Sequence, residues 1–288
     1  YVLRHPLGVA GLISPWNLPL YLLTWKIAPA IAAGNTVICK PSEFTSMTAF
    51  MLGEILTEAG LPKGVCNIIL GRGEPAGRVL VEHPGVPIIS FTGGTATGAK
   101  IQAGAASHFK KISLELGGKN AAIVLKDADL KKVIPPILRS SFLNQGEICL
   151  CTSKILVQEE VFEDFCEVFA EATKHLIVGD PRMEKTFMGP LISEAHLEKV
   201  SSLVENARKE NGKILVGGER SALPPPFNKG FFYSPTVIKD LTNCSEVHQT
   251  EIFGPVVSIN PFKYPHDAVK MANNTPYGLS ASVWTNDL

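Results

Sequence analysis

The chain has 288 residues, of which 45% are apolar and 19% charged, and its 27 Lys and Arg residues balance 27 Asp and Glu residues. This apolar share without net charge excludes an intrinsically disordered chain, and it argues against a nucleic-acid-binding protein, which usually carries a basic excess. At about 150 residues per domain, the length predicts two domains.

The first 117 residues alternate short apolar runs with helical stretches. The expected strands are residues 9–13, 36–39, 65–70, 88–91 and 111–114, and the expected helices are residues 22–33, 45–59, 75–82 and 97–106. Apolar strands that alternate with helices predict a parallel sheet with helices on both faces. Such a doubly wound sheet binds its ligand at the carboxyl ends of its strands.

The pattern changes after Gly117 and Gly118 but stays α/β. The expected strands are residues 121–125, 154–157 and 280–284, and the expected helices are residues 130–144, 161–176, 193–210 and 262–273. We expect Pro135 and Pro136 to kink the first of these helices or to delay its start. Residues 223–230 contain three consecutive prolines and read as a loop.

The six cysteines are too few for a disulfide-stapled secreted scaffold, and no C-x-x-C pair occurs among them. We therefore expect reduced thiols, a cytoplasmic protein and no metal site. Residues 6–25 carry no charged residue, which mimics a membrane span. Pro6, Pro15 and Pro19 interrupt the helix that a bilayer requires, so we expect a buried strand and turn instead, and no membrane association.

Cys149 follows a turn at Gly146, at the end of a helical pattern. Such a turn can expose a thiol and can offer backbone N–H groups to an oxyanion. The alternative is that Cys149 and Cys151 are buried, since free cysteines usually are.

Glu115 stands alone in an apolar run before Gly117 and Gly118. We expect desolvation among leucines to raise the pKa of Glu115 toward that of a general base. The alternatives are a surface residue on an edge strand or an ion pair with Lys119.

Three further features lie where strands end. Gly93 and Gly94 join a strand to a helix, which suits phosphate, although any Gly-rich turn looks similar. Lys40 and Glu43 follow another strand and could contact ribose hydroxyls, with Glu43 favouring NAD over NADP; an ordinary exposed loop is the alternative. Asn17 is the sole amide in a long apolar segment, and it is either structural or an oxyanion donor.

Seven segments, in this order, resemble the motifs of the aldehyde dehydrogenase family. They are S-P-W-N-L-P (14–19), K-P-S-E (40–43), F-T-G-G-T-A-T-G (91–98), E-L-G-G-K-N (115–120), N-Q-G-E-I-C (144–149), E-I-F-G-P (251–255) and N-N-T-P-Y-G-L (273–279). The resemblance implies an aldehyde dehydrogenase-like α/β fold, truncated at both ends: a Rossmann-type NAD-binding domain at residues 8–117 and an α/β catalytic domain at residues 118–288. Residues 1–7 would end an oligomerisation arm, and the whole protein would be a homodimer or homotetramer.

The resemblance also implies a mechanism. Cys149 would attack the aldehyde carbonyl, and the Asn17 amide and the Cys149 N–H would hold the oxyanion of the thiohemiacetal. Hydride would pass to NAD⁺, leaving a thioester that a water activated by Glu115 hydrolyses. Cys151 has no matching catalytic role.

Six residues resemble the family's contacts to NAD. Lys40 and Glu43 would bind the adenosine ribose, Gly93 and Gly94 the pyrophosphate, Glu251 the nicotinamide ribose and Phe253 the nicotinamide ring.

Three positions depart from the family pattern: Gly94 replaces Ser, Glu147 replaces Gln and Lys154 replaces Arg. Residues 11–26 and 146–153 resemble the members that oxidise 2-aminomuconic semialdehyde to 2-aminomuconate in the kynurenine pathway. Retinal or another aldehyde is an alternative substrate. A cysteine hydrolase that needs no cofactor and an inactive fragment or scaffold are alternative functions.

Overall fold

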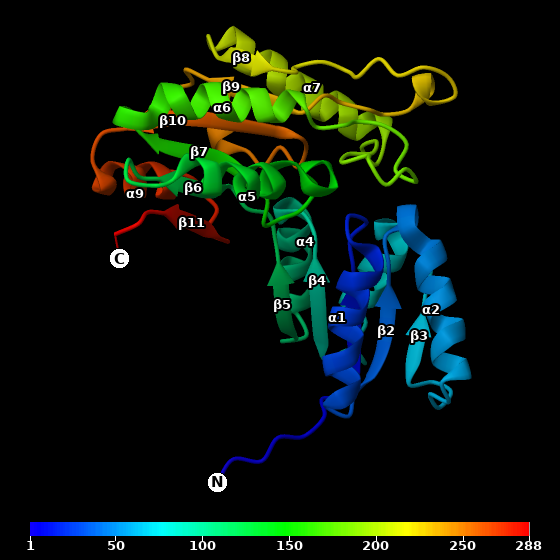
Figure 1. Ribbon diagram of the computed structural model, residues 1–288. Coiled ribbons are helices and arrows are strands. Elements are labelled where there is room, and N and C mark those ends of the chain that lie inside the picture. Colours follow the sequence, from blue (N-terminus) through cyan, green and yellow to red (C-terminus); the bar gives the residue numbers. More distant parts are fainter. Residues whose placement is uncertain (288) are drawn as a thin grey trace. The chain divides into compact units, whose positions relative to one another are not determined.

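The computed structural model describes residues 1–287 and divides into two compact units (Figure 1). Unit 1 comprises Tyr1–Gly117 and unit 2 comprises Gly118–Leu288, whose last residue lies outside the described part. The division falls between the paired glycines at which the sequence pattern changes.

Unit 1 contains a five-stranded parallel sheet in the order β3-β2-β1-β4-β5. Its strands are β1 (Val9–Ile13), β2 (Thr36–Lys40), β3 (Cys66–Ile68), β4 (Ile88–Thr92) and β5 (Lys111–Glu115). Its helices are α1 (Pro19–Ala32), α2 (Ser46–Glu58), α3 (Arg78–Glu82) and α4 (Thr95–Ala106). The parallel sheet predicted from the apolar runs is confirmed.

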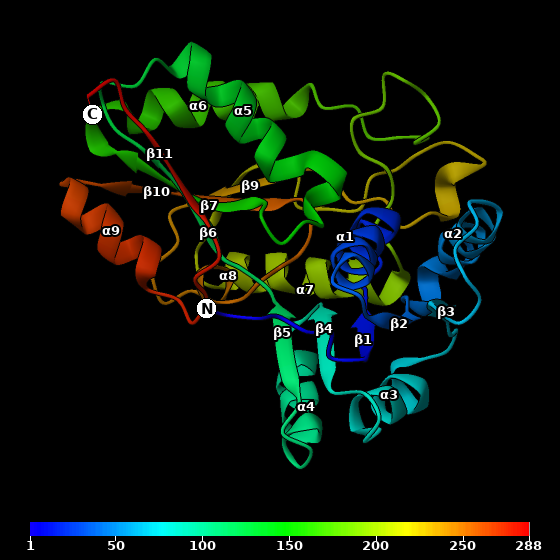
Figure 2. The same ribbon diagram turned by 90° about the horizontal axis from the view of Figure 1, so that it is seen from below.

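The helices cover both faces of the unit 1 sheet because successive side chains of a strand point to opposite faces. Ala10 and Leu12 of β1 belong to the core that α1 and α2 complete, whereas Ile13 belongs to the core under α3 and α4. Figure 2 shows these two helix pairs on opposite sides of the strands. The strand order reverses between β1 and β4, and doubly wound sheets bind ligands at the carboxyl side of this point.

Unit 2 contains a six-stranded sheet in the order β11-β6-β7-β10-β9-β8, parallel except for the β8–β9 pair. Its strands are β6 (Asn120–Val124), β7 (Thr152–Gln158), β8 (Lys213–Val216), β9 (Thr236–Lys239), β10 (Val256–Phe262) and β11 (Ala281–Trp284). Its helices are α5 (Leu130–Phe142), α6 (Phe162–Lys174), α7 (Glu194–Lys209), α8 (Glu246–Gln249) and α9 (Pro265–Asn273).

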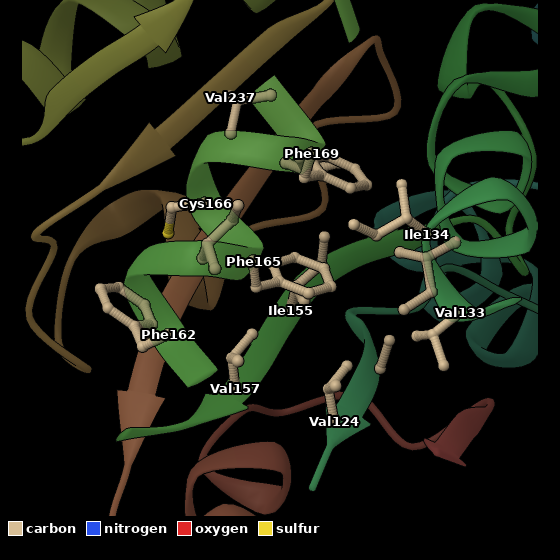
Figure 3. Packing of buried hydrophobic residues seen from close by; sticks show 14 of the residues in the cluster. Val124, Val133, Ile134, Ile155, Val157, Phe162, Phe165, Cys166, Phe169 and Val237 are labelled. Atoms are coloured by element: carbon tan, nitrogen blue, oxygen red, sulfur yellow. The ribbon is translucent and has the colours of Figure 1, made fainter. Parts of the chain in front are cut away.

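The main core of unit 2 lies between its sheet and the helices α5 and α6 (Figure 3). Phe165 and Phe169 of α6 stack with ring centroids 5.4 Å apart, and Ile155 and Val157 of β7 lie beneath α6. Leu156, between them in sequence, points to the opposite face and packs in the α9 core. Figure 2 shows α7 and α9 on that opposite face.

The prediction of a helix over residues 262–273 was wrong at its start. The central strand β10, which the sequence pattern did not reveal, runs to Phe262, and α9 begins at Pro265. Ser258, Asn260 and Pro261 break the apolar run that would have marked a buried strand. Asn260 fits inside the sheet because its Nδ2 donates to the Leu241 carbonyl at 2.6 Å.

The prolines of α5 do not delay its start, which was one of the two effects expected of them. The helix begins at Leu130, where the Asp129 carboxylate accepts from the Lys131 N–H at 3.1 Å. Pro135 and Pro136 are exposed, so water can satisfy the carbonyls that lose their helical donors.

Among residues 1–287, no helix is long and apolar enough to cross a bilayer. Within the same range, no cluster of three or more His, Cys, Asp or Glu side chains is placed to hold a metal ion.

Candidate functional site

The unit 1 residues singled out from the sequence lie at the carboxyl ends of the strands of the parallel sheet. Asn17 follows β1, Lys40 ends β2, Glu43 follows it, Gly93 and Gly94 follow β4, and Glu115 ends β5. All are at the carboxyl ends of strands, the edge at which such sheets bind ligands.

Lys40 and Glu43 form an ion pair at this edge. The Lys40 Nζ lies 3.6 Å from Glu43 Oε2 and donates to the Pro41 carbonyl at 3.1 Å. Lys40 is buried, whereas the Glu43 side chain is partly exposed. A fixed ammonium can donate to one hydroxyl of a diol, and the accessible carboxylate beside it can accept from the other hydroxyl.

The Gly93–Gly94 turn presents the start of α4. The Gly93 N–H donates to the Glu115 carbonyl at 3.0 Å, and a side chain on Gly93 would collide with the Phe91 ring. A side chain on Gly94, the residue that caps α4, would meet open space. N–H groups in the first turn of a helix have no helical acceptor, so this turn suits an anion.

Glu115 is exposed, so the expectation that leucines desolvate it was wrong. The strand β5 lies at the edge of its sheet, and its residues alternate between exposed and half-buried positions.

Lys26 is a charged group near Glu115 that the sequence interpretation missed. Its Nζ donates to Ser90 Oγ at 2.9 Å. Burial lowers the pKa of Lys26 to about 8, and the Glu115 charge partly opposes this. Lys26 is the single charged residue of α1, and that was the available signal.

Unit 2 brings three of the predicted residues together. Cys149, Glu251 and Phe253 line one pocket, together with Gly118 of the E-L-G-G-K-N segment. The pocket therefore joins a thiol, a carboxylate and an aromatic ring from segments about 100 residues apart.

A left-handed turn carries the chain from α5 to Cys149. Asn144, Gln145 and Gly146 have φ values of 51°, 59° and 71°. Such values cost energy in residues other than glycine, so neighbouring contacts must hold them. Gln145 Oε1 accepts from the Gly189 N–H at 3.1 Å, and a side chain on Gly146 would strike the Gly254 carbonyl.

Asn120 anchors the backbone of the Cys149 segment by hydrogen bonds, a role that the sequence interpretation missed. Its Nδ2 donates to the carbonyls of Cys149 at 2.6 Å and of Cys151 at 3.0 Å, and its Oδ1 accepts from the Ser280 N–H at 3.0 Å. Asn120 is only 4% exposed. An amide at the start of the otherwise apolar β6 was the available signal.

Two neighbours fix Glu251. Its Oε1 accepts from the Gly118 N–H at 3.1 Å, and its own carbonyl accepts from Lys199 Nζ at 3.1 Å. Burial raises the pKa of Glu251, and the Gly118 hydrogen bond opposes the shift. The Glu251 carboxylate thus lies at the pocket with a fixed orientation.

Glu147 and Cys151 flank the Cys149 position and are both buried. Burial raises the pKa of Glu147 to about 8, and hydrogen bonds from the Ile192 N–H and Gln145 oppose the shift. Burial also raises the pKa of Cys151 to about 12. Cys149 is the less buried of the two thiols.

The whole chain, residues 1–288, matches the aldehyde dehydrogenase family. It belongs to this family. The chain is 53% identical over 290 residues to the 2-aminomuconic semialdehyde dehydrogenase of Homo sapiens and 45% identical over 289 residues to the 2-aminomuconic 6-semialdehyde dehydrogenase of a Pseudomonas species. Each alignment covers 100% of this chain, but only 60% and 59% of those relatives.

Solved structures show the same fold. The betaine aldehyde dehydrogenase of Staphylococcus aureus, solved in complex with NAD⁺, superposes with a TM-score of 0.95 at 39% identity. The superposition covers 98% of this chain and 56% of that one. The chain thus spans about three fifths of the length of its relatives.

Proposed function

We propose that the protein oxidises an aldehyde to a carboxylic acid with NAD⁺. The observation that carries this proposal is the pocket that Cys149, Glu251 and Phe253 line together, in a chain of the aldehyde dehydrogenase family. A cysteine hydrolase without a cofactor would have no use for the last two.

Cys149 is the proposed nucleophile. Its thiolate adds to the aldehyde carbonyl, and its own N–H and the Asn17 side-chain amide donate to the oxygen that becomes negative. Oxidation of this adduct needs a hydride acceptor, which NAD⁺ would supply when bound. The resulting thioester on Cys149 is hydrolysed by a water from which Glu115 takes a proton, and the acid is released.

The residues present fit NAD⁺. The Lys40–Glu43 pair offers a donor and an acceptor for a ribose diol, and the open space at Gly94 leaves the start of α4 accessible to a pyrophosphate. Glu251 supplies a second carboxylate for a ribose, and Phe253 supplies a ring for the nicotinamide. The Staphylococcus aureus relative, solved with NAD⁺, supports this assignment.

For the substrate we propose 2-aminomuconic semialdehyde, and hence a role in the kynurenine pathway of tryptophan catabolism. The names of the human and Pseudomonas relatives support this choice. A low cysteine count, six in 288 residues, supports a reducing, cytoplasmic location. We also propose that the whole protein is a homodimer or a homotetramer.

The test is NADH formation by the longest protein that contains this chain, with 2-aminomuconic semialdehyde, retinal and a simple aliphatic aldehyde. Cys149→Ala should abolish NADH formation, whereas the matched variant Cys151→Ala should retain it. A protein that forms no NADH with any aldehyde refutes the proposal. Ester hydrolysis that neither needs nor responds to NAD⁺ would identify a hydrolase instead.

A further inference from the structure

Glu147 and His196 form a contact between the segment of Cys149, which lines the pocket, and the start of α7. The His196 Nε2 lies 3.6 Å from Glu147 Oε1, and the two side chains are 13% and 4% exposed. Glu147 precedes Cys149 by two residues, whereas His196 lies in the first turn of α7. The Ile192 N–H, just before α7, donates to Glu147 Oε1 at 3.3 Å.

His196 also holds the backbone of Phe253. Its Nε2 lies 2.6 Å from the Phe253 carbonyl oxygen, and since a carbonyl can only accept, this nitrogen carries the proton. The two rings meet edge to face, with centroids 6.2 Å apart. Phe253 has a φ of 59°, which is strained for an aromatic residue and persists only where surrounding contacts impose it.

We propose that Glu147 and His196 are positioning residues that tie the Cys149 segment to the Phe253 segment and so set where the Phe253 ring lies. His196 fixes the Phe253 carbonyl, and Glu147 fixes His196 against α7. The inference deepens the proposed function and rests on it, because Phe253 is the proposed contact of the nicotinamide.

The charges around this pair make it sensitive to pH. The charge of Lys199, also on α7, acts on His196, and the charge of Glu251 acts on Lys199. Cys149 and Cys151 lie on the same segment as Glu147. Burial raises the pKa of Glu147 to about 8 and lowers the pKa of His196, so burial favours the neutral form of both groups. Above pH 8, Glu147 becomes an anion two residues before Cys149 in the chain, and a carboxylate near a thiol disfavours the thiolate form.

The first test measures NAD⁺ binding by calorimetry, along with KM and kcat, in His196→Ala and His196→Gln. His196→Ala should raise the Kd and the KM for NAD⁺ at least fivefold and change kcat less. His196→Gln should restore most of the affinity, because its amide can still donate to the Phe253 carbonyl. An unchanged Kd in His196→Ala, or equal losses in both variants, overturns the role of His196.

The second test needs no catalytic activity. The rate of alkylation of Cys149 by iodoacetamide is measured from pH 6 to 9.5 by peptide mass spectrometry, in wild type and in Glu147→Gln. The two rates should agree near pH 6.5, and the variant should be at least twofold faster above pH 8.5. The matched control Glu194→Gln, an exposed residue of α7, should follow wild type.

The alkylation result separates this inference from the proposed function, because it does not depend on the oxidation of an aldehyde. A constant ratio of the two rates across the pH range overturns the proposed influence of Glu147 on Cys149. If His196→Ala fails to fold, His196→Gln and Glu147→Gln still decide, since both preserve polarity and approximate volume.

Discussion

Replacing Asn120 should loosen the Cys149 segment without touching the thiol. The Asn120 amide makes three hydrogen bonds, to the carbonyls of Cys149 and Cys151 and from the N–H of Ser280. In Asn120→Ala, these three backbone groups lose their partner at a site that is only 4% exposed.

The structure sets the expected magnitude. A buried hydrogen bond contributes about 1 kcal/mol, and an unsatisfied buried group costs about 1–3 kcal/mol. Asn120→Ala should therefore lower the free energy of unfolding by about 3 kcal/mol, with water entering the vacated space to limit the loss. Asn120→Asp should cost more, because a carboxylate cannot donate to the two carbonyls and would repel them.

The assay is urea unfolding followed by circular dichroism, combined with the alkylation rate of Cys149. The control is Asn67→Ala in unit 1, whose amide also donates to two carbonyls, those of Val37 and Gly64, but from an exposed side chain. We expect the control to lose less than 1 kcal/mol. The reasoning is refuted if Asn120→Ala and Asn120→Asp both unfold within 0.5 kcal/mol of wild type, a window of about the usual error.

Three further predictions concern other sites. The side chain of Gly94→Ser should fit the open space at the start of α4. Its hydroxyl should add about 1 kcal/mol of hydrogen bonding, so the variant should bind NAD⁺ about fivefold tighter. Unchanged or weaker binding in calorimetry contradicts this prediction. Burial, reinforced by the Lys154 charge, lowers the pKa of Lys119 to about 7. Between pH 7 and 10.5 the Lys119 amine is therefore protonated only in the unfolded chain, so the free energy of unfolding rises with pH. Lys119→Met should remove that slope and gain on the order of 4 kcal/mol at pH 7, and an unstabilised variant contradicts the argument. Burial lowers the pKa of His248 to about 3, so between pH 6.5 and 3 only the unfolded chain binds this proton. The free energy of unfolding should therefore fall by up to about 1.4 kcal/mol for each pH unit below 6.5. In matched thermal melts, His248→Leu should lose less stability than wild type as the pH falls from 6.5 to 3.

The sequence was most informative for unit 1. Its apolar runs became parallel strands, and Lys40, Glu43 and Gly94 lie at the carboxyl edge, because strand direction and connection length constrain a doubly wound sheet. It was least informative for Glu115, whose apolar neighbours suggested burial. Glu115 is exposed because β5 is an edge strand of the sheet, and the residues adjacent in sequence do not show which strand lies at the edge.

The sequence by itself determined the family and the parallel α/β class and singled out Cys149 as the candidate nucleophile, because these inferences depend on short segments whose residues are adjacent in the chain. Only the tertiary structure decided which groups surround Cys149. Gly118 and Glu251 are 133 residues apart, and His196 and Phe253 are 57 apart, yet each pair is hydrogen-bonded. Such contacts depend on how β6, β10 and α7 pack, and side-chain packing over long sequence separations leaves no local pattern to read.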